Sequence, residues 1–218
     1  MKSDHETVRY TGLVIAFTGC RRGCTTGDSV VPVYIAAFRM LLSMTDTWTA
    51  PPVDRSESPN VAPERTAAEA LLDYFRETLL WKCAGLSAEQ LKQRSVPPSS
   101  MSLLGLVRHM AEVERVWFRA RVAGEDLGPI FCSDTGPDGD FDDVDGADAE
   151  ADFATYQREV DAARAVLAAR DFDDTFALTR PEATIDVRAL VLHMIEEYAR
   201  HCGHADLIRE CVDGATGD

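Results

Sequence analysis

Much of this sequence repeats apolar residues every three or four positions, which is the spacing of one face of an α-helix. Four long segments, at about 64–84, 102–123, 147–170 and 186–211, carry such a stripe. Pro63 suits the first turn of the first segment, and Gly85 and Gly124 suit helix ends. No alternating strand pattern is visible after residue 44. The pattern predicts an all-α domain, built as an antiparallel four-helix bundle.

The connection between the second and third predicted helices is long and acidic. Between Asp134 and Asp152 it holds nine carboxylates and no Lys or Arg. Asp138 and Asp140 have the alternate spacing of a calcium loop, but Asp143 stands where the EF-hand turn requires Gly. We therefore expect a solvated, turn-rich loop with a crossover between the helices, and a place at the edge of a pocket is the alternative.

The first 43 residues differ in pattern from the rest. The apolar stretches 11–17 and 30–42 are each too short to span a bilayer, and a secretion signal fits poorly. Met44 opens a segment that resembles an ordinary cytoplasmic start. We expect residues 1–43 to be a poorly structured N-terminal extension. It is either not native to the protein or a poorly ordered tail of it. Residues 44–218 are expected to form the domain.

Charge and cysteine usage restrict the function. The chain has 37 acidic and 22 basic residues, for a net charge of −15. Such a surface repels polyanions, so we expect no nucleic-acid partner. Six cysteines without a pairing pattern favour reduced thiols in a cytoplasm. We expect a cytoplasmic protein without a membrane partner.

The last predicted helix carries polar residues on its apolar face. At about 100° per residue, four polar side chains fall within an arc of roughly 80° that Leu190 shares. These residues are His193, Glu197, His201 and His204. Burying imidazoles and a carboxylate is costly unless a partner satisfies them. A metal ion would do so, since residues one helical turn apart can reach one ion.

A second helix offers a further candidate ligand. His109 lies in the middle of the second predicted helix, on the face of Leu106, and Gly105 leaves space beside it. We predict a divalent-metal site made by His109 with Glu197 and His201. Three protein ligands leave an open coordination position, which is typical of catalytic metal sites.

Spacing alone leaves alternatives to this site. A metal-free hydrogen-bond network would also satisfy the four inward polar groups. The pattern also leaves open whether His193 or His204 replaces one of the three predicted ligands.

Four sequence blocks carry a family resemblance. They read WKCAGLSAEQL, PPSSMSLLGLVRHMAEVERVWF, DGDFDDVD and HMIEEYARHCGHADLIRE. In this order they resemble the DinB-like superfamily of metal-binding four-helix bundles over about residues 44–218. The closest resemblance is to an actinobacterial branch that includes the mini-circle protein. More distantly, the chain is similar to mycothiol-dependent maleylpyruvate isomerases, which share a Glu at the position of Glu197.

The resemblance implies both the ligands and the chemistry. It implies a divalent ion, zinc first and nickel second, on His109, Glu197 and His201. It also implies a cosubstrate thiol such as mycothiol, a small electrophilic substrate, and a transferase or isomerase reaction. A homodimer is in keeping with the family. Members of the family usually have Gln three residues after the last ligand, and this chain has His204 at that position.

Further side chains have expected roles near the ion. His204 and His193 are predicted to act in catalysis, as proton carriers or by orienting a ligand. Arg200 is predicted to bind a carboxylate of the thiol or substrate, with Arg108 and Arg115 as alternatives.

Two other kinds of function fit the same residues. A coordinated hydroxide would make the protein a metal-dependent hydrolase. In the second alternative the protein is a non-catalytic metal-binding or stress-related module, in which the ion reinforces the bundle.

Overall fold

The computed structural model describes residues 9–10, 13–14, 48–178 and 183–217. The chain divides into two units at Asp46. In the first unit, β1 (Arg9–Tyr10) pairs antiparallel with β2 (Leu13–Val14). The rest of the expected extension 1–43 lies outside the described residues. The expectations that this extension is poorly structured and that it is not native to the protein therefore stay predictions.

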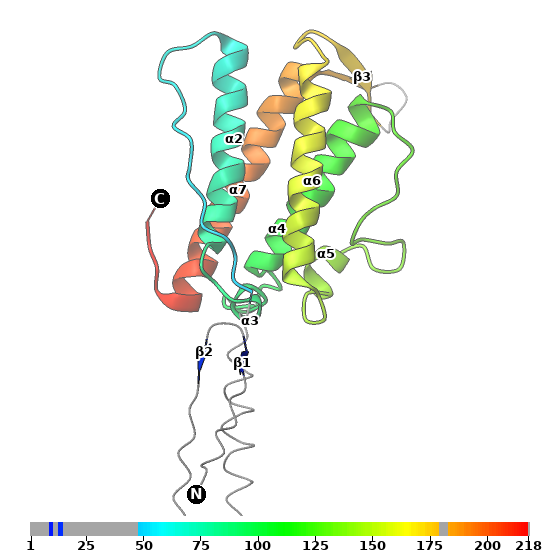
Figure 1. Cartoon of the computed structure of the whole chain (residues 1–218). Coiled ribbons are helices and arrows are strands. Elements are labelled where there is room, and N and C mark those ends of the chain that lie inside the picture. Colours follow the sequence, from blue (N-terminus) through cyan, green and yellow to red (C-terminus); the bar gives the residue numbers. More distant parts are fainter. Residues whose placement is uncertain (1–8, 11–12, 15–47, 179–182, 218) are drawn as a thin grey trace, which may run out of the picture. The chain divides into compact units, whose positions relative to one another are not determined.

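Long helices make up most of the second unit, as Figure 1 shows. They are α2 (Glu64–Cys83), α4 (Leu103–Glu114), α6 (Ala149–Ala168) and α7 (Val187–Asp213). The π-helix η1 (Arg115–Val122) continues α4 directly. These ranges lie close to the four predicted segments, and the prediction of a mainly helical domain is confirmed.

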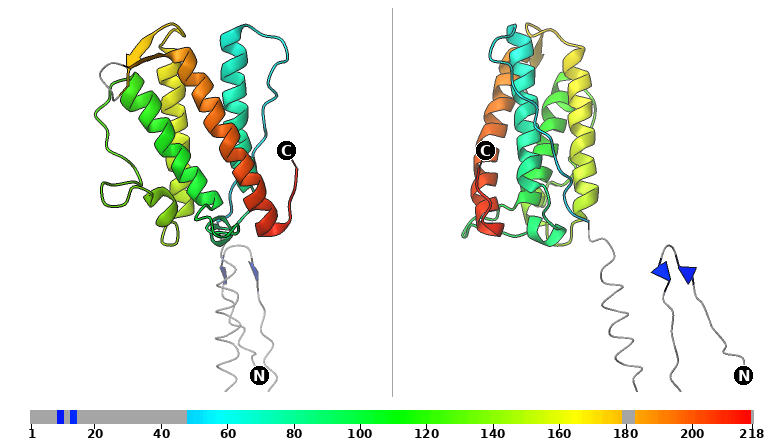
Figure 2. Two further views of the ribbon diagram at one scale, coloured as in Figure 1. Left: turned by 180° about the vertical axis from the view of Figure 1, so that it is seen from behind. Right: turned by 60° about the vertical axis from the view of Figure 1, so that its left-hand side comes forward.

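The four long helices run in two opposite directions. In Figures 1 and 2, α2 and α7 descend while α4 and α6 ascend. The closest packing is between α2 and α7 and between α4 and α6, and α4 also contacts α7. Because α4 and α6 point the same way, the chain between them returns along the molecule (Figure 2). The contact between α4 and α7 joins the two helices that carry the candidate ligands.

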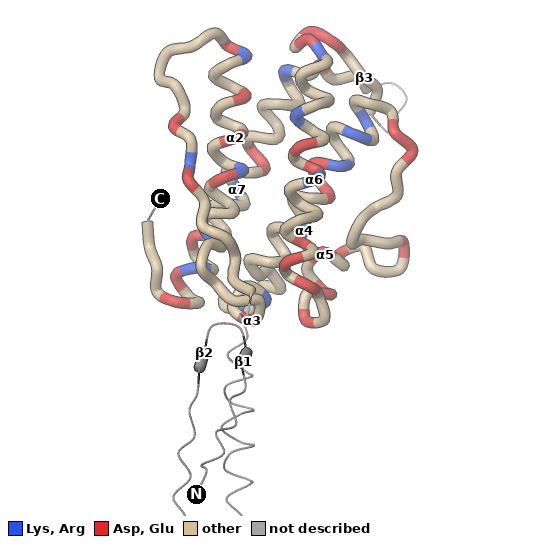
Figure 3. Tube along the Cα trace, in the orientation of Figure 1, with Lys and Arg blue, Asp and Glu red and all other residues tan. Residues whose placement is uncertain are grey.

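Short helices lie in two of the connections. The predicted capping box begins α3 (Ala88–Leu91), where Ser87 and Gln90 each accept the other's backbone N–H. Inside the acidic connection lies α5 (Gly139–Asp142), which contacts α4. Although Figure 3 shows acidic residues throughout this connection, Asp140 is buried. The expectation of a wholly solvated loop is therefore wrong for α5.

A β-hairpin precedes α7. Its strands β3 (Thr175–Ala177) and β4 (Thr184–Asp186) pair antiparallel. The expectation that no strand follows residue 44 is wrong here, because a three-residue strand is too short to show an alternating pattern. Asp186 ends the hairpin and caps α7 by accepting the backbone N–H of Ala189 at 2.6 Å.

The core contains a charged network that connects all four long helices. Arg76 of α2 donates two 2.8 Å hydrogen bonds to Glu114 of α4. Tyr198 of α7 donates to Glu114 at 2.7 Å, and the Tyr156 hydroxyl of α6 lies 3.0 Å from that of Tyr198. All four side chains are buried. Burial opposes the charge of Arg76, but the charge and hydrogen bonds of Glu114 raise its pKa above its ordinary value.

In the described part of the chain, no helix combines enough length and apolar character to cross a bilayer.

Candidate metal centre

The three predicted ligands meet where α4 and α7 pack together. One ligand atom from each of His109, Glu197 and His201 lies within 4.8 Å of the other two. The two imidazole ring centroids are 4.8 Å apart. Nε2 of His201 lies 3.5 Å from Oε2 of Glu197. The structure thus brings together two imidazoles and a carboxylate from distant parts of the chain.

The cluster lies at the edge of the core. The His201 side chain is 11% exposed, the Glu197 side chain 17% and the His109 side chain 26%. Partial burial limits competition from water, and the remaining exposure leaves part of each side chain in contact with solvent. This position suits a site that exchanges a ligand with solvent.

A carboxylate that the sequence analysis did not assign fixes the orientation of His109. Nδ1 of His109 lies 2.8 Å from Oδ2 of Asp140, on α5. A carboxylate oxygen accepts a hydrogen bond from a ring N–H, so this contact favours the tautomer of His109 in which Nδ1 is protonated and Nε2 is available to a cation. The sequence signal for Asp140 was its place in the DGDFDDVD block, but the alternate spacing there was interpreted as a failed calcium loop.

His201 is held as a neutral imidazole. Burial, followed by the nearby charges of His109, His204 and Arg200, lowers the pKa of His201 to about 4. Its Nδ1 lies 3.3 Å from Nδ1 of His204, and its Nε2 is directed to Glu197. Neutral imidazole is the form that binds metal ions. The side chain is therefore prepared for coordination at neutral pH.

The burial of His201 predicts an acid-sensitive stability of the metal-free protein. Its pKa falls from an ordinary 6.5 to about 4 on folding. Between these values the unfolded chain binds more protons, so the stabilisation present above pH 6.5 is lost as the pH falls towards 4. This shift corresponds to about 3 kcal/mol for a fully buried group, and solvent screening at the edge of the core reduces the expected contribution to roughly 2 kcal/mol. Urea unfolding of chelator-treated wild type and His201→Gln between pH 7.5 and 4 measures it, and parallel pH profiles would contradict it.

The other predicted site residues occupy different positions. His193 packs against Trp117, with ring centroids 4.7 Å apart, and is not part of the three-residue cluster. Arg200 is an exposed residue whose guanidinium pairs with Glu196 at 2.6 Å and with Oε1 of Glu197 at 3.2 Å. Its contact with Glu197 lies on the carboxylate oxygen opposite the one that is directed to His201.

The two alternative arginines have structural partners. Arg108 is buried and pairs with Asp152 at 3.1 Å. Arg115 pairs with Glu159 at 2.6 Å. Neither guanidinium is free to bind a substrate without breaking an ion pair inside the fold.

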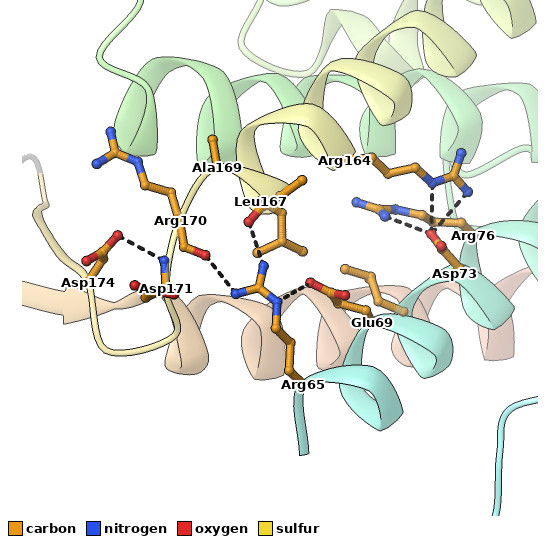
Figure 4. A pocket seen from close by; sticks show the side chains of 12 residues that line it. Arg65, Glu69, Asp73, Arg76, Arg164, Leu167, Ala169, Arg170, Asp171 and Asp174 are labelled. Atoms are coloured by element: carbon orange, nitrogen blue, oxygen red, sulfur yellow. Dashed lines mark hydrogen bonds and ion pairs between the residues drawn. The ribbon is translucent and has the colours of Figure 1, made fainter. Parts of the chain in front are cut away.

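A separate cavity of about 680 Å³ opens between α2 and α6 (Figure 4). None of the three candidate ligands lines it. Several of its charges are paired with one another, since Arg65 binds Glu69 and Asp73 binds both Arg76 and Arg164. We therefore take the α4–α7 contact, and not this cavity, as the candidate functional site.

The fold and the cluster define a helical protein with a candidate divalent-metal site between two helices. A profile of the mycothiol-S-transferase family matches residues 67–214, which is more than half of the chain. The chain belongs to this family, which falls within the DinB-like group of the sequence resemblance. No curated protein and no solved structure matches the chain.

Proposed function

We propose that this protein is a metal-dependent transferase that joins mycothiol to a small electrophile. The observation that carries the proposal is the cluster of His109, Glu197 and His201 in a member of the mycothiol-S-transferase family. We further propose that the fold is a four-helix bundle with the acidic connection beside its metal site. A cytoplasmic location, the absence of a nucleic-acid partner and a homodimer stay predictions.

The residues present suit a divalent cation. Two imidazoles and one carboxylate are donors that zinc and nickel accept. We propose zinc as the ion, with nickel as the alternative. Nε2 of His109 and Nε2 of His201 are the donor atoms, because the Nδ1 atoms of both rings are engaged with Asp140 and His204. Glu197 contributes Oε2, because Oε1 is bound to Arg200.

A cation in this site supplies the Lewis acidity that converts a bound thiol, with an ordinary pKa of about 8.5, into a nucleophilic thiolate at neutral pH. The protein's own residues prepare the site for that chemistry. Arg200 holds one oxygen of Glu197 and so turns the other towards His201. Nδ1 of His201 lies 3.3 Å from Nδ1 of His204. We propose that His201 donates this hydrogen bond, which would leave its Nε2 as the atom that binds the cation.

We propose one specific role for each of the other predicted site residues. We propose His193, one helical turn before Glu197, as the proton carrier, while His204 orients His201. A role for Arg200 in binding the thiol's carboxylate would require it to exchange its exposed ion pair with Glu196 for the new contact while it keeps its contact with Glu197. Exposed pairs are worth only about 0–1 kcal/mol, so such an exchange costs little.

Metal content tests the ligand set. Purified wild type is expected to hold one equivalent of zinc or nickel per chain. His109→Ala and Glu197→Ala are expected to lose most of it, because each removes one of three protein donors. Glu210→Gln, on the exposed surface of the same helix α7, is the matched control and is expected to keep the full equivalent. Full occupancy in both ligand variants would overturn the proposed site.

Thiol binding tests the transferase. Titrating mycothiol into the cobalt-substituted protein is expected to produce a sulfur-to-cobalt charge-transfer band. Transfer to a chromogenic haloarene should then be measurable. A metal-loaded protein without this band would favour the non-catalytic module or the hydrolase.

A further inference from the structure

The acidic connection is fixed to α4 by backbone hydrogen bonds to one carboxylate of that helix. Oε1 of Glu112 accepts the backbone N–H groups of Ile130, Phe131 and Cys132, at 2.6, 2.5 and 3.0 Å. Glu112 is buried and lies about one helical turn after His109 on α4. One side chain of the ligand-bearing helix therefore holds the segment that leads towards α5.

A second set of contacts docks α5 itself. Arg108 donates to the carbonyl oxygen of Gly139 at 3.0 Å. A Cβ atom on Gly139 would collide with the carbonyl oxygen of Phe131, so the two backbone segments approach too closely for any other residue. A Cβ atom on Gly105 would lie only 2.8 Å from Cδ1 of Phe141. The backbone of α5 is thus seated against α4 on both sides of Asp140.

Asp140 uses both carboxylate oxygens within this arrangement. Oδ1 accepts the backbone N–H of Phe141 at 3.0 Å, and Oδ2 lies 2.8 Å from Nδ1 of His109. The side chain is 5% exposed. Phe141 adds a ring contact on His109, with centroids 5.2 Å apart. Asp140 therefore has little freedom to leave the imidazole.

We propose that Asp140 is a positioning residue for His109, and that the docked acidic connection serves to present it. The hydrogen bond selects the tautomer with Nδ1 protonated and directs Nε2 towards Glu197 and His201. The negative charge also makes the imidazole a stronger donor. This inference rests on the proposed function only for the identity of the cation. The tautomer of His109 can be measured in the metal-free protein.

Zinc affinity is the first test. Asp140→Ala and Asp140→Asn are expected to weaken zinc binding about 10- to 100-fold, as measured by competition with a chromogenic chelator. Asp142→Asn is the matched control, because it removes the same charge from an exposed position in α5 and is expected to leave the dissociation constant unchanged. Equal affinity in wild type and both Asp140 variants would overturn the proposal.

The tautomer of His109 separates positioning from a loss of structure. In ¹⁵N-histidine-labelled, metal-free wild type above pH 8, His109 is expected to show a protonated Nδ1. In Asp140→Ala it should change to the Nε2-protonated form that prevails in water. In Asp140→Asn the two forms should mix, because a carboxamide can also donate to Nδ1. Loss of the His109 signals in His109→Gln assigns the spectrum.

The two proposals fail in different ways. If wild type binds no metal ion but His109 shows the Asp140-dependent tautomer, the proposed function fails and the positioning contact stands. If zinc binds and the tautomer is unchanged in Asp140→Ala, the positioning role is wrong and the metal site stands.

Discussion

Replacement of Glu114 by alanine is expected to destabilise the folded protein by about 3–5 kcal/mol. The reason is that Arg76, which is only 3% exposed, would lose its two-bond partner in the core. Tyr198 would also lose the acceptor of its hydroxyl. Arg76 would keep only its 2.9 Å contact with the partly exposed Asp73. Leaving a buried charge without its buried partner costs far more than the pair itself contributes. Urea unfolding of wild type and Glu114→Ala, both metal-free, measures the difference.

Two further variants separate charge burial from simple loss of volume. Arg76→Met/Glu114→Leu removes both charges and is expected to recover most of the lost stability, because apolar replacements of buried ion pairs are often neutral. Asp145→Ala removes the exposed partner of Arg94, which keeps its hydrogen bonds to the carbonyl oxygens of Phe141 and Asp142, and should cost less than about 1 kcal/mol. If Glu114→Ala costs no more than Asp145→Ala, the network does not stabilise the core.

His201→Gln is expected to lower the rate of thiol transfer by about 1000-fold. Glutamine keeps much of the volume of histidine but removes the imidazole donor beside Glu197. Loss of Lewis-acid stabilisation worth about 4 kcal/mol corresponds to this factor in rate. Initial rates of mycothiol consumption with a haloarene, at saturating zinc, measure the effect.

The control for this variant lies on the same helix. Glu210→Gln changes an exposed side chain of α7 far along the helix from the cluster, and its rate should equal that of wild type. Excess zinc should not restore the His201→Gln rate, because the missing donor belongs to the protein. A variant that loses its metal ion but keeps more than a tenth of the wild-type rate would show that the ion is not needed for transfer.

The extents of the long helices could be predicted because the signals for them are local. The apolar stripe, the Ser87 capping box and the glycines after helix ends all act within a few residues. The three-residue ligand cluster could be anticipated for the same reason. Glu197 and His201 share a stripe with apolar residues of one helix, and His109 shares a stripe with Leu106 of another, so each was expected to face the interior.

The supporting residues depended on contacts between distant segments. Glu114 and Arg76 each have the sequence appearance of a surface charge, and only the rotation of α2 against α4 buries them together. Asp140 looked like one of nine solvated acids, but the seating of α5 on α4 brings it to His109. Arg200 was expected to bind a ligand, and its neighbours on α7 engage it in two ion pairs.

The apolar period along the chain specified the four long helices and the face of each that turns inward, because this period is a property of consecutive residues. Which inward side chains meet depended on packing, and the docking of α5 made Asp140, not another acid of the loop, the partner of His109. Such pairings depend on how helices rotate and cross and on where a connection docks. These are results of packing across the whole domain and leave no periodic trace along the chain.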